Sequence, residues 1–274
     1  MVNSPTVSVI MGVFNCEETL PYAIKSLMDQ TYQDFELILC DDNSTDNTLN
    51  IAESYATKYP HRILVLKNDK NKGLNFTLNK CLQKARGKYI ARMDGDDMSL
   101  PKRFEKEVSF LESHQDIAIV GAAMNVFDEK GVWGKRVYIG EPQRKDFLKG
   151  TPFAHPVCMV RKEAYKAVNG YSVQKKLLRV EDYHLWLKMY SKGFKGVNLN
   201  EVLYLYRDDR NGYKKRKFKY RINEAYVMRL AVRMLKLPSY NYLFALRPIL
   251  VGLLPYCFYD KLHRWKMHNN VREK

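Results

Sequence analysis

The sequence is poor in cysteine, and the cysteines that it has are not paired. Five of them, at positions 16, 40, 81, 158 and 257, are scattered over 274 residues, and no Cys-x-x-Cys spacing occurs. An odd number without short spacings argues against the disulfide framework of a small secreted protein. The first four lie in apolar patterns, which is typical of small buried side chains. We therefore expect a protein of a reducing, cytoplasmic compartment.

Long hydrophobic runs are also missing. The stretch TVSVIMGVF (6–14) follows no positive residue and is too short for a secretory signal with its cleavage site, so it is better explained as a first strand. Arg247, Pro248 and Pro255 interrupt the apolar stretch 242–266, which falls short of the ~20 apolar residues that a spanning helix needs. With 46% hydrophobic residues and no low-complexity segment, the chain can still bury a sizeable core.

Acidic residues are scarce at one end of the chain. The net charge is +16, and residues 207–274 hold 17 Lys or Arg against 5 Asp or Glu, so +12 of that charge lies in the last quarter. A uniformly basic surface would favour nucleic acid as a partner, whereas a basic tail favours a local electrostatic partner.

The first half of the chain alternates between two hydrophobic periodicities. Strand-like and helical segments follow one another regularly: 7–14, 17–30, 35–40, 44–59, 62–68, 74–85, 88–94, 101–114 and 117–127. This alternation predicts an α/β fold with a Rossmann-like, mostly parallel sheet and helices on both faces. Ligands of such sheets bind at the carboxyl ends of the strands, which here are the loops 14–17, 40–46, 68–73 and 94–99.

The pattern changes after residue 127. We expect a hairpin from residue 128, a strand and a short helix around 155–171, a helix over 180–193 and a last strand over 201–207. Two helical stretches, 219–236 and 241–254, follow a basic segment. These patterns predict one domain over 1–210, with halves 1–98 and 99–210, and a basic amphipathic helical tail over 211–274.

Carboxylates follow two of the predicted strands. Asp41 and Asp42 end the second, and Asp94, Asp96 and Asp97 end the fourth. Turns and helix caps also use Asp, but three close carboxylates exceed what a cap needs. A hard divalent cation would offset their repulsion, because Mg²⁺ and Mn²⁺ prefer oxygen ligands and bind one or two carboxylates together with substrate phosphates.

Four blocks together resemble the family 2 glycosyltransferases. They are VSVIMGVFNCEETL, LILCDDNSTDNT, NKGLNFTLNKCLQKARGKYIARMDGDD and EDYHLWLKM, and the resemblance covers roughly residues 5–210. It implies the GT-A fold, a nucleotide-binding half before an acceptor half, and metal-dependent inverting transfer from a nucleotide sugar. The expected enzyme is a hexosyl- or N-acetylhexosaminyltransferase of bacterial cell-surface polysaccharide synthesis that uses a UDP-sugar and Mn²⁺ or Mg²⁺.

The resemblance also implies individual roles. On the donor side, the matching positions are Val13 and Phe14 at the base pocket with Glu17 beside them, Asp42 at the uracil edge, Asn71, Gly73 and Asn79 bordering the diphosphate, Asp94 at the ribose or sugar, and Asp96 at the metal. On the acceptor side, they are Asp182 as catalytic base, Glu181 beside it, Trp186 as an acceptor-site aromatic, and His155.

Several of these positions have a structural alternative. Glu181 and Asp182 begin a helix, where acidic side chains are favoured by their interaction with the helix dipole. His155 is explained equally well as a buried structural histidine whose ring nitrogens are hydrogen-bonded within the protein. The chain also departs from its family, because YRDDRNGYKKR stands where relatives carry a histidine after the last strand. Asp208, Asp209 or Arg210 are candidates to replace it. Arg210 and Lys214 are candidates for phosphate contacts, unless the run is a solvated loop.

The apolar, aromatic and cationic stretch 242–266 predicts contact with an anionic membrane surface. The alternative is a core helix packed on the catalytic domain. Membrane contact suits a glycan or lipid-linked acceptor, which the enzyme would meet at the inner face of the cell membrane.

Three other functions are weaker. A nucleotidyltransferase would need a Gly-rich phosphate loop near the amino terminus, and GVFNCEETL has none. A nucleic-acid-binding protein would need a basic stripe with exposed aromatics, whereas the charge here alternates with apolar residues. A non-catalytic relative that binds a nucleotide sugar or a partner is disfavoured by the intact Asp42, Asp94, Asp96 and Asp182.

Overall fold

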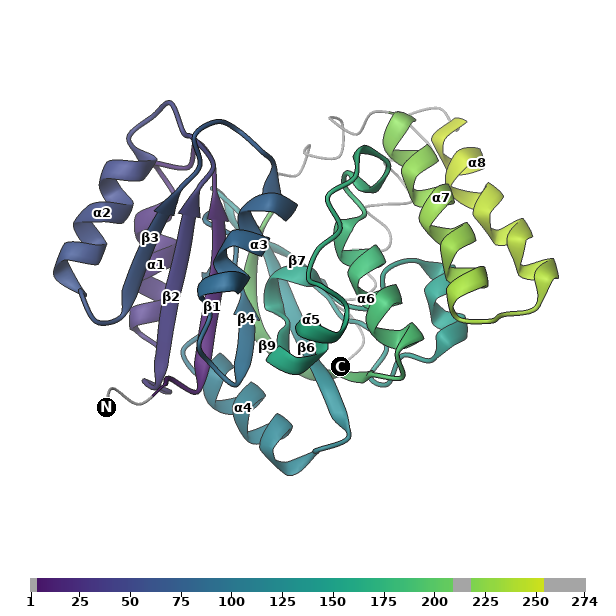
Figure 1. The fold of residues 1–274 in the computed structure, drawn as a ribbon, viewed down its shortest axis with the longest axis horizontal. Helices are drawn as coiled ribbons and strands as arrows, with labels where there is room; N and C mark the ends of the chain where they lie inside the picture. The colour runs from purple at the N-terminus through teal and green to yellow at the C-terminus, as the bar shows by residue number, and fades with distance from the viewer. Residues whose placement is uncertain (1–3, 209–217, 254–274) are drawn as a thin grey trace.

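A computed structural model describes residues 4–208 and 218–253. Its first half alternates as predicted (Figure 1). The elements are β1 (Val7–Val13), α1 (Leu20–Met28), β2 (Phe35–Asp41), α2 (Thr48–Lys58), β3 (Ile63–Lys67), α3 (Leu74–Lys84) and β4 (Tyr89–Arg92). The four strands are parallel in the order β3-β2-β1-β4, so their carboxyl ends meet at one edge.

The second half turns the sheet into a mixed one. Its elements are β5 (Met98–Ser99), α4 (Arg103–Ser113), β6 (Ile117–Asp128), β7 (Gly131–Arg136), β8 (Met159–Arg161), α5 (Lys162–Ala167), α6 (Glu181–Ser191) and β9 (Lys195–Arg207). β8 lies between β4 and β6 and is antiparallel to both. The sheet is therefore less parallel than predicted beyond β4, although the long β6 and β9 pair in parallel. The expected hairpin is β6–β7.

Helices cover both faces of the sheet, as predicted (Figure 1). One buried cluster joins the sheet to α1, α2 and α4, through side chains such as Ile24, Ala52 and Phe104. The other joins the opposite face to α3, α5 and α6, through side chains such as Leu78 and Trp186. Short 3₁₀ helices connect these elements: η1 (Arg144–Lys149), η2 (His155–Val157) and η3 (Lys175–Leu177).

The carboxyl-terminal elements are α7 (Phe218–Met234), η5 (Ser239–Leu246) and α8 (Arg247–Leu253). α7 packs on α6 and buries Val227, Met228 and Ala231 in the same cluster. The predicted helix 241–254 is a 3₁₀ helix followed by a short α-helix. The rest of the predicted tail, 211–217 and 254–274, lies outside the described residues. Within the described part, none of the helices combines the length and apolarity required to cross a membrane.

Candidate active site

A crevice of about 430 Å³ opens at the carboxyl ends of β1, β4 and β9. Five of the residues predicted to bind the donor or the metal line it: Val13, Phe14, Glu17, Asp94 and Asp96. The lining residues that the sequence analysis did not single out include Asn15, Asp46 and Arg207. The side chain of Phe14 is 47% exposed, which is unusual for phenylalanine and leaves its ring available for stacking.

The loop after β1 is tied to the loop after β2. Asn15 adopts a positive φ of 48°, and its Oδ1 accepts a hydrogen bond from the backbone N–H of Thr45 (2.9 Å). Glu17 accepts one from the N–H of Asn47 (2.8 Å), and Asp46 accepts one from the N–H of Glu17 (3.2 Å). These reciprocal bonds fix one wall of the crevice.

Asp42 lies outside the lining of this crevice and is buried. Its carboxylate accepts hydrogen bonds from Asn68 Nδ2 (2.7 Å) and from the backbone N–H groups of Lys72 (2.9 Å) and Gly73 (2.8 Å). Gly73 has a φ of +85°, which few other residues adopt. Asp42 thus fixes the conformation of the loop that leads into α3. Its predicted contact with uracil stays a prediction.

The other two predicted residues near the diphosphate also lie outside the crevice lining. Asn71 is exposed on the loop before α3. Asn79 bonds both backbone groups of Tyr171 at 2.8 Å, which ties α3 to the chain after α5.

Three carboxylates after β4 form the group of acidic side chains, within the described residues, that could hold a metal ion. One oxygen of each of Asp94, Asp96 and Asp97 lies within 4.8 Å of the others. Asp97 is buried, and its Oδ1 accepts from the backbone N–H of Arg207 (2.8 Å). Its Oδ2 is buried without a partner, which is costly unless a cation takes it up. This oxygen set fits Mg²⁺ or Mn²⁺.

The three carboxylates of this cluster differ in their partners and in their pKa values. Both Nη atoms of the buried Arg92 donate to the two oxygens of Asp94. Although Asp96 reaches solvent, its enclosure and then the Asp94 charge raise its pKa to about 6. Burial, Asp94 and Asp96 raise the pKa of Asp97 well above the usual range. Asp94 is therefore engaged by arginine, and Asp96 and Asp97 remain to bind a cation.

Asp182 stands in the first turn of α6 and is partly buried. Burial and then the neighbouring Glu181 raise its pKa to about 7, and Arg92 acts in the opposite direction. A carboxylate whose pKa lies near neutrality can accept a proton more readily than an ordinary one. Burial raises the pKa of Glu181 too. The dipole of the helix favours ionised acids at this position, so it does not account for the raised pKa values of Glu181 and Asp182.

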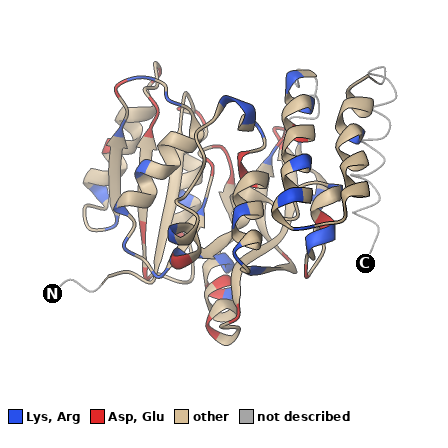
Figure 2. Ribbon diagram, turned by 45° about the vertical axis from the view of Figure 1, so that its right-hand side comes forward, with Lys and Arg blue, Asp and Glu red and all other residues tan. Residues whose placement is uncertain are grey.

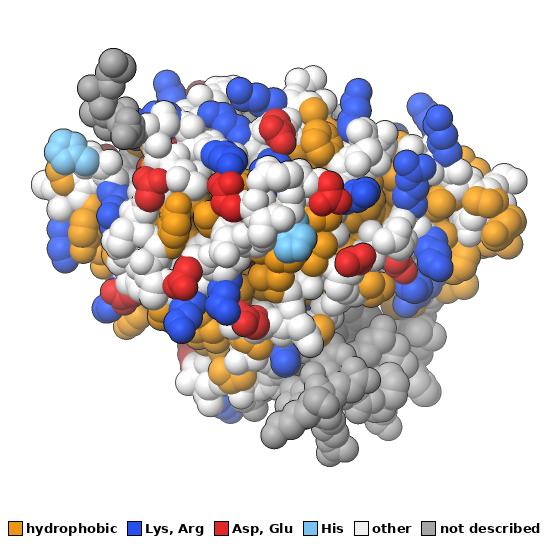
Figure 3. Space-filling view, turned by 90° about the horizontal axis from the view of Figure 1, so that it is seen from below, with side chains coloured by type: hydrophobic (Ala, Val, Ile, Leu, Met, Phe, Trp, Pro, Cys, Tyr) orange, Lys and Arg blue, Asp and Glu red, His pale blue; other side chains and the backbone are white. Residues whose placement is uncertain are grey.

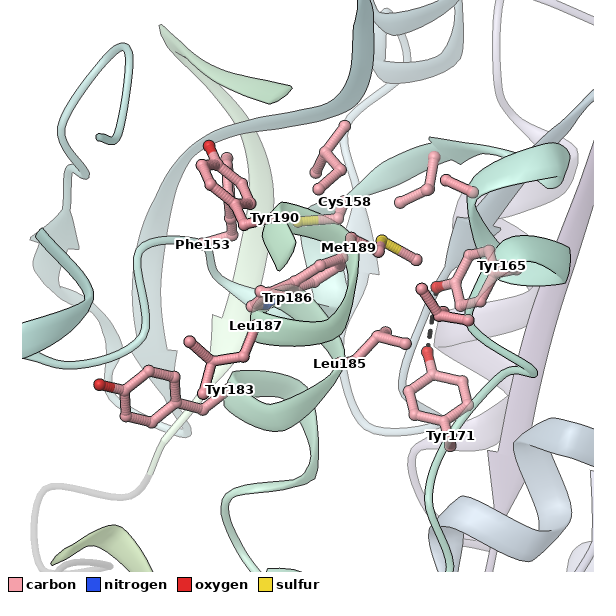
Figure 4. Close-up of a cluster of buried hydrophobic side chains, with 14 of the residues drawn as sticks. Phe153, Cys158, Tyr165, Tyr171, Tyr183, Leu185, Trp186, Leu187, Met189 and Tyr190 are labelled. Carbon is pink, nitrogen blue, oxygen red and sulfur yellow. Dashed lines mark hydrogen bonds between the residues drawn. The ribbon is translucent and has the colours of Figure 1, made fainter. Parts of the chain in front are cut away.

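The two aromatic residues expected near the acceptor lie below the surface. Trp186 is fully buried and packs edge-on against Phe153 (Figure 4) and His155, so its indole does not reach solvent in this structure. His155 is buried, and its Nε2 shares a hydrogen bond with the hydroxyl of Tyr171 (2.7 Å). Burial and then Arg92 lower its pKa well below the usual value. Both side chains are thus part of the buried interior, and direct contact with an acceptor stays a prediction.

Arg207 is a functional candidate that the sequence analysis missed, as is Arg92. It ends β9 and is the one cationic side chain among the described residues that line the crevice. Its Nε donates to the carbonyl of Asp96 (3.3 Å), and its guanidinium lies over the ring of Phe127. Asp208, a candidate to replace the missing histidine, instead pairs with Arg136 (2.6 Å). Asp209, Arg210 and Lys214 lie outside the described residues.

Comparisons with known proteins agree with this geometry. Residues 8–168 match the family described as glycosyl transferase family 2. The chain is 45% identical over 269 residues to the putative glycosyltransferase EpsE of Bacillus subtilis, covering 98% of this chain and 97% of the relative.

A second relative carries a more specific name. The chain is 30% identical over 225 residues to the UDP-Glc:α-D-GlcNAc-diphosphoundecaprenol β-1,3-glucosyltransferase WfaP of Escherichia coli, covering 81% of this chain and 85% of the relative.

Among solved structures, the mannosyltransferase PcManGT of Pyrobaculum calidifontis, in complex with GDP-Man and Mn²⁺, is similar in fold. The TM-score is 0.68 at 16% sequence identity, over 99% of this chain and 82% of that chain. This likeness confirms the predicted fold class.

Proposed function

The chain belongs to glycosyl transferase family 2, and from this premise we propose that it transfers a sugar from a nucleotide diphosphate, UDP as the first candidate, to a hydroxyl group of a growing cell-surface glycan. We infer that the transfer inverts the anomeric carbon. The observation that carries the proposal is the position of two carboxylate groups around one buried arginine: the Asp94–Asp96–Asp97 cluster on the crevice and Asp182 at the start of α6.

The donor would occupy the crevice. Phe14 offers an exposed ring for the base, and Asp94, fixed by Arg92, offers carboxylate oxygens for ribose or sugar hydroxyls. Arg207 places a cation at the same crevice, where it would attract the diphosphate. This arginine is our candidate for the part that a histidine plays in relatives.

Asp96 and Asp97 would hold the metal ion. Asp96 is accessible from the crevice, and Asp97 presents an unpartnered buried oxygen behind it. When bound, a divalent cation supplies positive charge that stabilises the departing diphosphate. The identity of the ion, Mn²⁺ or Mg²⁺, is part of the proposal, and the Mn²⁺ of the mannosyltransferase complex supports it.

Asp182 would act as the base. The acceptor hydroxyl attacks the anomeric carbon from the side opposite the diphosphate, its proton passes to the carboxylate of Asp182, and the bond between the sugar and the diphosphate breaks. A pKa raised to about 7 lets the carboxylate hold that proton after transfer. Burial raises this pKa most, and the repulsion of Glu181 beside it adds to the effect.

We place the acceptor among glycans carried on a lipid diphosphate. The name of the Escherichia coli relative supports this choice, because it specifies a diphosphoundecaprenol-linked sugar. An acceptor of this kind would bring the enzyme to the inner face of the cell membrane as a peripheral protein. We assign no nucleic acid partner.

Calorimetric titration with UDP, GDP and the other nucleoside diphosphates tests this function, first with Mn²⁺ and then with a chelator. We expect UDP to bind with micromolar affinity that the chelator abolishes, and Arg207→Met to weaken that affinity about tenfold because one charge-assisted contact is lost. Leu64→Met on β3 is a control on an exposed side chain that does not line the crevice.

The alternatives give distinct results in the same titration. Tight binding of another nucleotide would keep the site and change the donor. Metal-dependent UDP binding without transfer from any UDP-sugar to a lipid-linked acceptor would favour a non-catalytic relative. Absence of binding to every nucleotide would refute the donor site.

A further inference from the structure

Four leucines form an exposed stripe along η5 and α8. Leu243, Leu246, Leu250 and Leu253 are 70%, 52%, 62% and 68% exposed. Their spacing of three, four and three residues places them on one side of consecutive helical turns. We call these four side chains the leucine stripe. A single exposed leucine needs no explanation, but a row of four along one helical face does.

The leucine stripe faces away from the rest of the protein. Ala245 and Pro248, on the other side of the same segment, are buried, and both η5 and α8 pack on α7. The segment therefore places its small side chains against α7 and its large ones outward, which reverses the usual arrangement of a surface helix. None of the elements in the described ranges 4–208 and 218–253 covers this apolar face.

Exposed apolar side chains concentrate around the leucine stripe. Half of the large hydrophobic side chains exposed in the described part of the chain lie between residues 218 and 253. The others are distributed over several elements of the catalytic domain, such as Tyr22, Leu64 and Val132. Figure 3 shows hydrophobic side chains gathered at the right-hand end of the molecule, with Lys and Arg side chains beside them.

The segment that carries the leucine stripe contains no acidic residue, and the acids on the elements packed against it, Glu224 on α7 and Asp146 on η1, are each paired with a cation. From residue 237 to residue 259 the sequence contains no Asp or Glu, and Arg247 is its one charged residue. Beside the segment, α7 exposes Arg229 and Arg233, whose spacing of four residues places them on one helical face, and Lys236 is exposed in the turn that follows α7. Figure 2 shows α8 almost free of charged residues next to the blue positions of α7.

We propose that the leucine stripe docks on an anionic lipid surface, with the leucines in the interface and Arg247, Arg229, Arg233 and Lys236 at the headgroups. Apolar side chains bordered by cations and free of acids are the chemistry of interfacial helices. A second copy of the chain fits less well, because its cationic border would face the same border of its partner. This docking proposal rests on the proposed function in one respect: docking would bring the enzyme to a lipid-linked acceptor in the membrane.

Vesicle flotation of the full chain tests the docking. The vesicles contain phosphatidylglycerol and phosphatidylcholine in equal amounts, or phosphatidylcholine alone. We expect wild-type protein to bind the anionic vesicles and to lose part of that binding at high salt. Leu243→Glu combined with Leu250→Glu should weaken binding at least about tenfold, because two apolar side chains leave the interface and two negative charges meet anionic lipid.

The control carries the same change of charge elsewhere. Val132→Glu combined with Val173→Glu alters two side chains that are 59% and 57% exposed on β7 and on the loop after α5. It should bind vesicles like the wild type. All proteins are compared by circular dichroism and by UDP titration, so that misfolding is recognised.

Three results would overturn the docking surface. They are failure of the wild type to bind anionic vesicles, equal binding by the leucine variant, and a wild-type dimer that the leucine variant dissociates without any vesicle binding. Failure of the proposed function is distinguishable, since it would abolish UDP binding in every protein and leave flotation unchanged. Loss of flotation with intact UDP binding concerns the leucine stripe alone.

Discussion

The carboxylates that follow β4 and the carboxylate pair that begins α6 lie in contrasting surroundings. Asp94 is held by both Nη atoms of Arg92, and Asp97 accepts from a backbone N–H while its other oxygen stays unpartnered. Asp182 has burial and Glu181 acting in the same direction, and its pKa rises to about 7. Burial raises the pKa of Asp96 and Asp97 as well, so the groups differ in arrangement rather than in the direction of the pKa shift. We propose that the first group, whose carboxylate oxygens lie within 4.8 Å of one another, binds a cation, and that the second takes up a proton.

Arg92 links the two groups. It neutralises Asp94 directly, and its charge lowers the pKa of both Asp96 and Asp182, against the stronger effect of burial. Because a bound cation would keep the clustered carboxylates deprotonated, and Asp182 stands outside the cluster, we expect donor binding and proton transfer to depend on different residues. Substitutions in one group should therefore leave the function of the other intact.

The largest effect is expected at Asp182. Asp182→Asn removes the proton acceptor without changing the shape of the side chain, so transfer should fall by about 10³-fold, within the range attributed to a positioned base. UDP affinity should stay within about twofold of the wild type, since the crevice is untouched. Transfer is measured with labelled UDP-sugar, and affinity by calorimetry. Glu181→Gln is the matched control and should retain most of the transfer rate.

Normal transfer by Asp182→Asn would remove Asp182 from the mechanism. Equal losses in Asp182→Asn and Glu181→Gln would instead assign the effect to the start of α6 as a whole. Either result would contradict the proposal that one carboxylate group binds the cation and that Asp182 alone accepts the proton.

The second effect is expected at Asp96. Asp96→Asn removes the accessible negative charge of the cluster, so donor affinity in the presence of Mn²⁺ should fall by about 100-fold, the upper range for disturbed metal sites. With a chelator, wild type and variant should bind UDP equally weakly. Asp116→Asn, at an exposed aspartate that pairs with Lys195 outside the crevice lining, is the control. An Asp96→Asn protein that keeps metal-dependent binding would show that the cation is held elsewhere.

The sequence predicted the parts of this arrangement that depend on local patterns. Strand and helix periodicities located the elements up to residue 127, and carboxylates at strand ends located the cluster. The antiparallel β8 was not placed, because its position between β4 and β6 depends on pairing across more than sixty residues of chain. Trp186 was expected near the acceptor because of the family resemblance, and helical periodicity alone does not show that its indole is fully buried against Phe153 and His155.

The roles of Arg92 and Arg207 were missed for a different reason. Both end strands, at β4 and β9, and an isolated arginine at such a place resembles a solvated charge. A signal was available for Arg92, since it stands two residues before Asp94 in an otherwise apolar run and a buried arginine needs a carboxylate. No equivalent signal marks Arg207, because only the β6–β9 pairing brings it to the crevice.

The smallest effect, and the one that tests the link between the groups, is expected at Arg92. The rate of transfer at saturating donor should rise with pH through an apparent pKa near the value of about 7 of Asp182, because only the deprotonated carboxylate accepts the proton. Arg92→Met removes a positive charge that favours deprotonation. The pKa of Asp182 should therefore rise, and the acid limb of the profile should move to higher pH by up to about one unit.

Two further variants make this prediction specific. Arg92→Lys keeps the charge but loses the two-pronged contact with Asp94, so it should raise KM for the donor and leave the acid limb in place. Arg207→Met removes a cation that does not act on Asp182, so it should weaken donor binding and also leave the limb unchanged. The profiles are measured over about pH 5 to 9. A limb that moves equally in all three variants would mean that the pH dependence arises from donor binding, and that the two carboxylate groups are not independent.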